Sequence, residues 1–530
     1  MSGDGVGRSD WKTTGPPATA RIAKGADALN FILVMSDSLR RDHVSAYSNQ
    51  PEEWPSGGRW PVQTPNLDRF ADRAALFQDF YVGSFPTVLN RRELHTGRSV
   101  FTFGEWEALP EDETTMSQVL TAAGYNTMLV ADTPHIFRRG FNYERGFTGF
   151  EWIRGQENDG HFTDPADVPV PFAENKMRSN LASFQTHGRN AAHRVQEADH
   201  SCPRTFRTAA EWLERNHANG PFCLVVDTFD PHEPWDAPDW YTDKYDPDYK
   251  GESISFPKYD YWENFLSPEE LRHCHALYCG EVSLVDRWFG EILETVDSLN
   301  LWDDTAIVFM SDHGYYFGEY GLIGKAIMME EAPAHPFPLH PAVNHLPLIV
   351  HIPGMTSAGQ QVNGFVQPQD FMPALLELAG AKDPGTMHGK SFVPLVRGEA
   401  GQVRPAAISS HSIVAPVAGR PSTIVTEEWT LIMGAPVTDA TPARTEGMPG
   451  GTGVNVLGPQ RGPLRPEEPG EYAVAPHLYR TVEDPHHAED VIADHPDVAR
   501  ELQALLIEYL ESINTDEKYI APRRAMRFSR

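Results

Sequence analysis

The chain has 530 residues, 40% of them hydrophobic, which is typical of a globular protein with a sizeable core and excludes disorder throughout. Its formal net charge of −30 excludes a general affinity for nucleic acid or for an anionic membrane surface. No apolar run approaches the ~20 residues that cross a bilayer. Residues 1–27 are rich in Gly, Thr and Ala, lack a signal-peptide pattern and predict a flexible arm. We therefore expect a cytoplasmic protein.

Apolar runs that end in acidic or imidazole residues recur along the chain. They occupy residues 30–37, 126–135, 222–232, 305–314 and 346–354. Helical patterns separate them, for example at residues 114–125 and 205–216. This alternation predicts an α/β fold with a large, mostly parallel sheet flanked by helices.

The ends of these predicted strands carry the residue types that bind metals. They are Asp37, Asp132, Asp227, Asp230, His232, Asp312 and His313. A single acidic residue after a strand is commonly a helix cap or a turn former. Several such ends meet at one edge of an open α/β sheet, so together they favour a metal site. The Asp312-His313 pair supplies an oxygen and an imidazole, which favours zinc, manganese or iron over calcium.

The stretch "GSFPTVLNRRELHTGR" at residues 83–98 predicts a helix that begins near Thr87. The free N–H groups at that end would face an anion, and Arg91 would lie one turn along the same face. The alternative is that Thr87 merely caps the helix, as Thr does well.

The remaining chain divides the protein into two parts. Residues 28–395 are predicted to form the catalytic domain, and residues 396–530 a smaller C-terminal α+β subdomain that contains a long loop at 435–470. The four cysteines have neither zinc-site spacing nor the density of a disulfide scaffold, so they are interpreted as buried or incidental thiols.

Several stretches, in this order, resemble the sulfatase branch of the alkaline phosphatase superfamily. They include "MSDSLRRD", "RRELHTGR", "FDPHEPW" and "SDHGYYFGEYGLIGK". The resemblance implies an alkaline-phosphatase-like fold and an ester hydrolase that carries a nucleophile on a bound divalent metal. It assigns the metal ligands to Asp37, Thr87, Asp312 and His313.

Two departures from ordinary sulfatases bear on the chemistry. In those enzymes the nucleophile is a Cys or Ser that is converted to formylglycine, whereas the matching position here is Thr87, which cannot be converted. The resemblance therefore implies that the Thr87 hydroxyl itself attacks, activated by the metal and by the helix N-terminus. The pairs Asp37-Ser38 and Asp312-His313 resemble the phosphonate monoester hydrolase and phosphodiesterase relatives. They favour one transition metal over calcium.

The resemblance also assigns roles around the reacting group. Lys325 and Arg91 would neutralise oxygens of the transferred group, and His232 would protonate the leaving group or hold the anion. A lone Lys or His in a loop is otherwise solvated surface. The roles of Asp132, His135, His340 and His345 stay open.

Three functions compete. The favoured one is a metal-dependent hydrolase of phosphate diesters or phosphonate monoesters, acting on a small anionic ester through a threonine nucleophile. The second is a sulfatase that uses unmodified threonine, and the third is a non-catalytic binding protein on a sulfatase scaffold. Retention of the residues named above argues against the third. The oligomeric state stays open, with a homo-oligomer as one possibility.

Overall fold

The computed structural model describes residues 28–164, 168–178, 181–327, 335–414, 420–434 and 475–528. The predicted arm at residues 1–27 and the predicted loop at 435–470 lie outside these residues. Among the described residues, no helix is long and apolar enough to cross a membrane.

The central sheet has the strand order β14-β2-β13-β8-β1-β6-β4-β5. In that order its strands are β14 (Gln360–Val362), β2 (Ala75–Phe77), β13 (Leu348–His351), β8 (Thr305–Ser311), β1 (Asn30–Ser36), β6 (Phe222–Thr228), β4 (Asn126–Ala131) and β5 (Gly149–Trp152). Neighbours pair in parallel except at β13, which is antiparallel to both β2 and β8. The predicted mostly parallel sheet is confirmed, and the run at 346–354 supplies its antiparallel strand.

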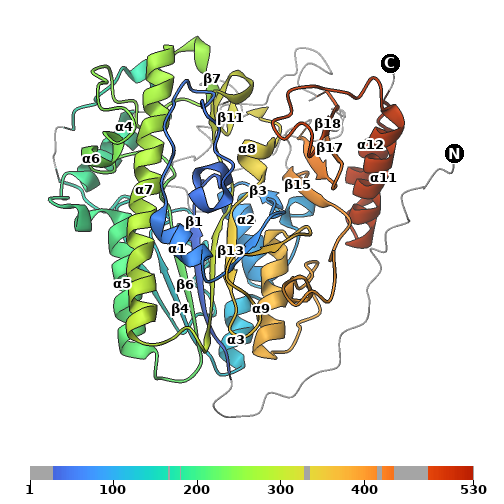
Figure 1. The fold of residues 1–530 in the computed structure, drawn as a ribbon, viewed down its shortest axis with the longest axis horizontal. Coiled ribbons are helices and arrows are strands. Elements are labelled where there is room, and N and C mark those ends of the chain that lie inside the picture. The colour runs from blue at the N-terminus through green and yellow to red at the C-terminus, as the bar shows by residue number, and fades with distance from the viewer. Residues whose placement is uncertain are drawn as a thin grey trace.

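Helices cover both faces of this sheet, as Figure 1 shows. Both faces of β1 are buried, which explains its apolar sequence. Ile32 and Val34 pack into one hydrophobic core, while Leu33 and Met35 pack into the other. The first core includes residues of α1 (Pro65–Ala71), α5 (Ser201–Asn216) and α7 (Pro268–Ser298). The second includes residues of α2 (Thr87–Thr96), α3 (Met116–Ala122) and α9 (Phe371–Ala379).

The long helix α7 begins with strong local signals. Ser267 is its N-cap, and its hydroxyl accepts a hydrogen bond from the Glu270 N–H, while the Glu270 carboxylate accepts one from the Ser267 N–H. Pro268 occupies the first turn, where no N–H partner is lost. The helix runs the height of the central sheet beside α5.

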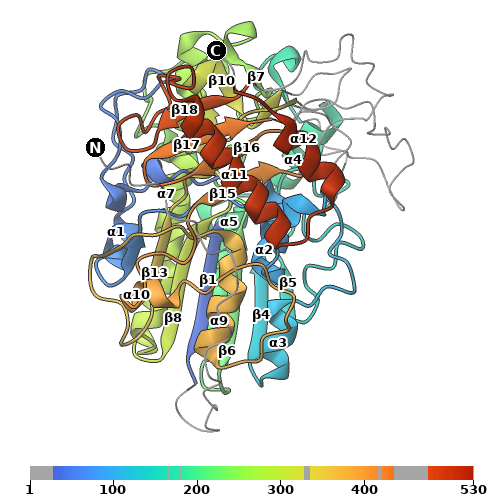
Figure 2. The ribbon, with the colours of Figure 1, turned by 90° about the vertical axis from the view of Figure 1, so that its right-hand side faces the viewer.

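A second sheet has the order β18-β17-β16-β15-β3. Its strands are β18 (His477–Arg480), β17 (Trp429–Met433), β16 (Ser422–Val425), β15 (Ala407–His411) and β3 (Ser84–Phe85). The helices α11 (Pro496–Ser512) and α12 (Glu517–Ala525) pack on it, as Figure 2 shows. The C-terminal part thus has α+β character, but β3 comes from the catalytic part and pairs in parallel with β15.

The described residues also form shorter α-helices and strands. They are α4 (Leu181–Ala191), α6 (Asp239–Thr242), α8 (Pro341–Asn344), α10 (Val393–Val396), β7 (Asp260–Tyr261), β9 (Tyr316–Phe317), β10 (Leu322–Gly324), β11 (Ala326–Ile327) and β12 (His335–Pro336).

Candidate active site

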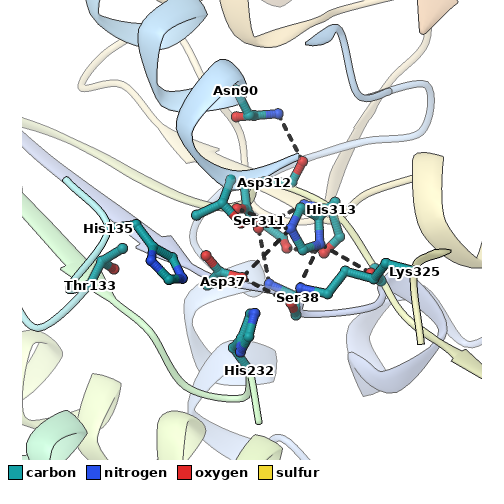
Figure 3. A network of polar contacts seen from close by, with 12 residues as sticks. Asp37, Ser38, Asn90, Thr133, His135, His232, Ser311, Asp312, His313 and Lys325 are labelled. Carbon is teal, nitrogen blue, oxygen red and sulfur yellow. Dashed lines mark hydrogen bonds and ion pairs between the residues drawn. The ribbon is translucent and has the colours of Figure 1, made fainter. Parts of the chain in front are cut away.

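The central strands bring the predicted metal ligands together. In the register of β1 and β8, Ser36 lies opposite Ser311, so Asp37 and Asp312 follow at the same level on adjacent strands. The ligand atoms of Asp37, Asp312 and His313 lie within 4.8 Å of one another, and all three side chains are buried. Figure 3 shows them converging above the end of β1.

His313 presents one ring nitrogen to the two carboxylates. Its Nδ1 lies 3.1 Å from the Gly314 carbonyl, which accepts the N–H and leaves a lone pair on Nε2. Nε2 lies 3.7 Å from Asp37 Oδ1 and 3.6 Å from Asp312 Oδ2. Burial lowers the pKa of His313 to about 3, so the ring is neutral, as a metal ligand must be.

Thr87 is the first residue of α2, so the predicted helix start is confirmed. The cap position belongs to Pro86, which makes the helix-cap interpretation of Thr87 wrong. The Thr87 Oγ1 atom instead lies 3.2 Å from His313 Nε2. One turn later, Asn90 Nδ2 donates to the Asp312 carbonyl at 2.8 Å and ties the helix to the end of β8.

Arg91 faces the carboxylates. Its Nε and Nη2 donate to Asp227 at 2.7 Å each, and its Nη1 donates to Asp312 Oδ2 at 2.6 Å. Nη1 also lies 3.1 Å from Asp37 Oδ2. The side chain is completely buried. Arg91 therefore orients the ligands, and this geometry differs from the expectation that it contacts oxygens of the transferred group.

The electrostatics of the two aspartates differ. Burial and the neighbouring Asp312 raise the pKa of Asp37 well above its ordinary value. Burial acts in the same direction on Asp312, but His313 and Arg91 outweigh it and hold the pKa of Asp312 at about 2. Asp37 Oδ2 is buried and accepts no hydrogen bond from the described residues. A second cation beside Asp37 would relieve the repulsion between the two carboxylates and would serve as a partner for Asp37 Oδ2.

The residues therefore fit a divalent metal. Two carboxylates, one neutral imidazole and the Thr87 hydroxyl surround one point, and a mixed oxygen and nitrogen set suits zinc, manganese or iron. In this arrangement the predicted ligands Asp37, Thr87, Asp312 and His313 come together.

Ser38 links the candidate metal ligands to Lys325, a role that was not predicted for it from the sequence. Its backbone N–H donates to Asp312 Oδ1 at 2.9 Å, and its hydroxyl donates to Asp37 Oδ1 at 2.8 Å. Lys325 Nζ donates to the same hydroxyl at 3.1 Å. Ser38 adopts a left-handed backbone, with φ of 64°. Its place directly after Asp37 in the sequence was the available signal.

Two histidines lie across the centre from Lys325 (Figure 3). The Nδ1 of His232 lies 2.6 Å from the Glu233 carbonyl, which fixes a proton there and leaves Nε2 as an acceptor. His135 packs edge-on against Phe229, and its Nδ1 has no hydrogen-bond partner within the described part of the chain. Burial lowers the pKa of both rings well below the ordinary value, so both are neutral.

A buried charged group next to these histidines was not predicted. Arg178 donates to Glu157, to Glu233 and to the Tyr259 hydroxyl oxygen. The second carboxylate oxygen of each glutamate accepts no hydrogen bond from any residue that the structure describes. Glu233 follows His232 in "DPHEP", which was a weak signal, whereas Glu157 and Arg178 belong to connecting segments without a recognisable motif.

Three residues of open role lie outside the ligand group. The carboxylate of Asp132 accepts a backbone N–H at the end of β6 at 2.6 Å. His340 stacks on Tyr320 with ring centroids 3.9 Å apart. His345 Nε2 donates to the Gln78 carbonyl at 2.6 Å. These contacts are those of structural residues.

The chain matches known proteins over most of its length. A family model described as Sulfatase matches residues 29–381. Among curated relatives, an arylsulfatase of Clostridium perfringens is 22% identical over 69% of this chain and 78% of its own. The multifunctional alkaline phosphatase superfamily protein PehA of Trinickia caryophylli is 25% identical over 69% of this chain and 77% of its own.

Solved structures share the fold. The phosphonate monoester hydrolase of Agrobacterium radiobacter has a TM-score of 0.65 at 19% identity, covering 92% of this chain and 96% of that one. BT4656, solved with its substrate D-glucosamine-2-N,6-O-disulfate, has a TM-score of 0.66 at 18% identity, covering 94% of this chain and 100% of that one. At these identities the likeness establishes the fold, which is the predicted one.

Proposed function

The chain belongs to the sulfatase family of hydrolases, and from that premise we propose that it hydrolyses phosphate diesters or phosphonate monoesters, with the Thr87 hydroxyl as nucleophile. One observation carries the proposal. The Thr87 Oγ1 atom stands at the head of α2, 3.2 Å from His313 Nε2, beside the carboxylates of Asp37 and Asp312.

One divalent transition metal is assigned to Asp37, Thr87, Asp312 and His313. When bound, it supplies positive charge that favours ionisation of the Thr87 hydroxyl and attracts the anionic oxygens of the ester. Arg91 orients both carboxylates and lowers their pKa values, because it donates to Asp312 and lies 3.1 Å from Asp37 Oδ2.

The proposed hydrolysis then proceeds in two steps. In the first, Thr87 Oγ1 bonds to phosphorus and the ester oxygen of the leaving group departs. In the second, a water oxygen bonds to phosphorus and the bond to Thr87 breaks. In the first step, His232 Nε2 takes the Thr87 proton and passes it to the leaving oxygen. In the second, it takes a proton from the water and passes it to Thr87 Oγ1, so protons balance in each step and the ring is neutral between them. The Lys325 ammonium lies where it can donate to non-bridging oxygens.

The choice of phosphoryl over sulfuryl transfer rests on Thr87. A formylglycine can expel sulfate by collapse of its hemiacetal, whereas a threonine ester must be cleaved by water. The Asp312-His313 pair supports a transition metal rather than calcium. The phosphonate monoester hydrolases among the structural neighbours, from Agrobacterium radiobacter and Silicibacter pomeroyi, are consistent with this choice.

A sulfatase that uses unmodified threonine is the second candidate, because several relatives bear sulfatase names. Charge does not separate the two, since a sulfate monoester and a phosphate diester each carry one negative charge. The third candidate, a non-catalytic binding protein, is disfavoured because its site would not need a hydroxyl aligned with a full ligand set.

The deciding experiment compares kcat/KM for matched nitrophenyl esters of phosphate diester, phosphonate and sulfate on one metal-loaded preparation. We expect the phosphate diester or the phosphonate to lead. A tenfold lead of the sulfate ester, ~1.4 kcal/mol in transition-state stabilisation, would reverse the choice.

Rapid quenching with a slow substrate tests the covalent step. Mass spectrometry of the peptide that contains Thr87 should show the group that remains when the leaving group departs, which is a substituted phosphoryl group from a diester or a phosphonyl group from a phosphonate. The Thr87→Ala protein should show none, and Thr102→Ala, which removes a buried hydroxyl bonded to the Ser99 carbonyl, should show the same label as the wild type. A label on another residue would contradict the assignment of the nucleophile.

A further inference from the structure

A second group of metal-binding side chains lies outside the hydrolytic centre. His43 ends a short 3-10 helix (Arg41–His43) that follows β1, and His275 and Cys279 lie one turn apart on α7. All three side chains are buried, and their ligand atoms lie within 4.8 Å of one another. We call these three residues the His–His–Cys cluster.

Both histidines point the same ring nitrogen at one spot. His43 Nε2 and His275 Nε2 lie 2.7 Å apart. The other nitrogen of each ring has its own partner, since His43 Nδ1 is 2.7 Å from Asp42 Oδ1 and His275 Nδ1 is 2.7 Å from Ser56 Oγ. A carboxylate or hydroxyl partner behind each imidazole is the usual support of a metal-binding histidine.

Without a cation, a single proton satisfies this arrangement. The Ser56 hydroxyl donates to His275 Nδ1, His275 Nε2–H donates to His43 Nε2, and His43 Nδ1–H donates to Asp42. A cation would take the place of the proton between the rings, that proton would lie on His275 Nδ1, and Ser56 would then accept from it. The cluster therefore has two self-consistent states, which differ in the tautomer of His275 and in the cation between the rings.

Charge around the cluster favours a divalent cation. Arg40 pairs with Asp42 at 2.5 Å and with Glu319 at 2.7 Å, so this group of three carries one net negative charge. A thiolate at Cys279 brings the total to two. Burial lowers the pKa of His43 and of His275, which keeps both imidazoles neutral and ready to bind.

Trp60 borders both the cluster and a surface cavity. Its ring centroid lies 6.0 Å from that of His275. The same Trp60 lines a surface cavity of about 550 Å³ together with Tyr245 and Ser283. On the other side, Phe317 stacks on His275 with centroids 4.7 Å apart and closes the cluster with apolar surface.

We propose that the His–His–Cys cluster binds one thiophilic divalent cation of the Zn²⁺ class through His43 Nε2, His275 Nε2 and Cys279 Sγ. On binding, the Cys279 S–H bond breaks, its proton leaves to solvent, and a bond from sulfur to the metal forms. Two nitrogens and one thiolate suit zinc and exclude magnesium and calcium. The bound ion would tie the segment after β1, which begins with Asp37, to α7.

Cobalt substitution tests the site directly. In the Co²⁺-loaded full-length protein, we expect a thiolate-to-cobalt charge-transfer band, which the sulfur-free hydrolytic centre cannot produce. The band should survive in Asp312→Asn, which impairs the hydrolytic centre, and disappear in Cys279→Ser. Cys274→Ser is the matched control, because Cys274 is a buried thiol on the same helix that bonds to the Ile254 carbonyl.

Zinc content and thermal unfolding give independent measures. The wild type and Cys274→Ser should hold one more equivalent of Zn²⁺ than Cys279→Ser, and added Zn²⁺ should raise their Tm but not that of Cys279→Ser. If Cys279→Ser does not fold, His43→Gln replaces it in every measurement. A Co²⁺-loaded wild type without the band, or a Cys279→Ser protein with the wild-type band, would overturn the proposal. Failure of the ester assays would leave this result untouched.

Discussion

The hydrolytic centre and the His–His–Cys cluster lie at the two ends of one short segment, residues 37–43. At one end, Asp37 joins Asp312 at the carboxyl ends of two parallel strands, and only positive charge keeps both ionised. At the other end, His43 meets a helix face through neutral rings and a thiol. The first site is electrostatically incomplete without a cation, whereas a shared proton completes the second. One centre thus needs a cation to balance its carboxylates, whereas hydrogen bonds satisfy the other without one.

Removing the Thr87 hydroxyl should have the largest effect on activity. We expect Thr87→Ala to lose on the order of 10⁴-fold in kcat, because the bond-forming atom is gone. Metal content and Tm should stay near the wild-type values, since Asp37, Asp312 and His313 remain. Steady-state kinetics and elemental analysis check this. Thr87→Ser should keep part of the activity, and a wild-type kcat in Thr87→Ala would refute the assignment.

Removing the Arg91 charge should have the largest effect on stability. In Arg91→Met, three buried carboxylates lose their common cation, so we expect the free energy of unfolding to fall by about 3–5 kcal/mol. Added metal should restore part of it, because a cation relieves the same repulsion. Urea denaturation with and without metal measures both effects. Arg59→Met is the control, since Arg59 forms an exposed ion pair and should change stability little.

Lys325 should set the alkaline limit of activity. Burial lowers its pKa below the ordinary value of 10.5, so the ammonium that attracts the substrate is lost as the pH rises through that lowered pKa. Activity should therefore fall on the alkaline side. In Lys325→Arg the charge persists, and the fall in kcat/KM should move to higher pH. An unchanged alkaline limb in a variant that stays active would exclude Lys325 as its cause.

His345 should make a smaller, purely structural contribution to pH dependence. Burial lowers its pKa to about 3, against 6.5 in the unfolded chain. The contribution of this residue to the free energy of unfolding is present above pH 6.5 and is lost as the pH falls toward 3. Near pH 5.5 the loss already amounts to about 1 kcal/mol. His345→Gln, which keeps an N–H for the Gln78 carbonyl, should flatten that slope in urea denaturation. The exposed His193 serves as the control position. An unchanged slope in His345→Gln would argue against a neutral buried ring.

Local sequence predicted the elements that carry the candidate site residues. The strands before Asp37 and Asp312 are apolar because both of their faces are buried, and this pattern is visible without a structure. The helix start at Thr87 was equally readable. The direction of β13 was not, because an apolar run has the same composition in a parallel or an antiparallel strand.

Long-range contacts were the part that sequence could not give. Arg91 was expected to face substrate oxygens, but its partners Asp227 and Asp312 lie 136 and 221 residues away. Cys279 was interpreted only as a buried or incidental thiol, and its nearness to His43 depends on how α7 crosses the segment after β1. His345 is adjacent to an apolar strand in sequence, yet its ring stacks on Tyr81 rather than entering the site.

The pairing of β3 with β15 means that the two predicted parts of the chain are not interchangeable modules. Phe85, the last residue of β3, lies opposite His411 in the register and packs its ring 5.0 Å from that of His313. Only Pro86 separates it from Thr87. The C-terminal region therefore helps to fix the position of Thr87, the proposed nucleophile. A protein shortened at residue 395 would lose β15, the strand against which that position is aligned. Sequence changes in β15 can therefore alter reactivity without any change among the proposed metal ligands.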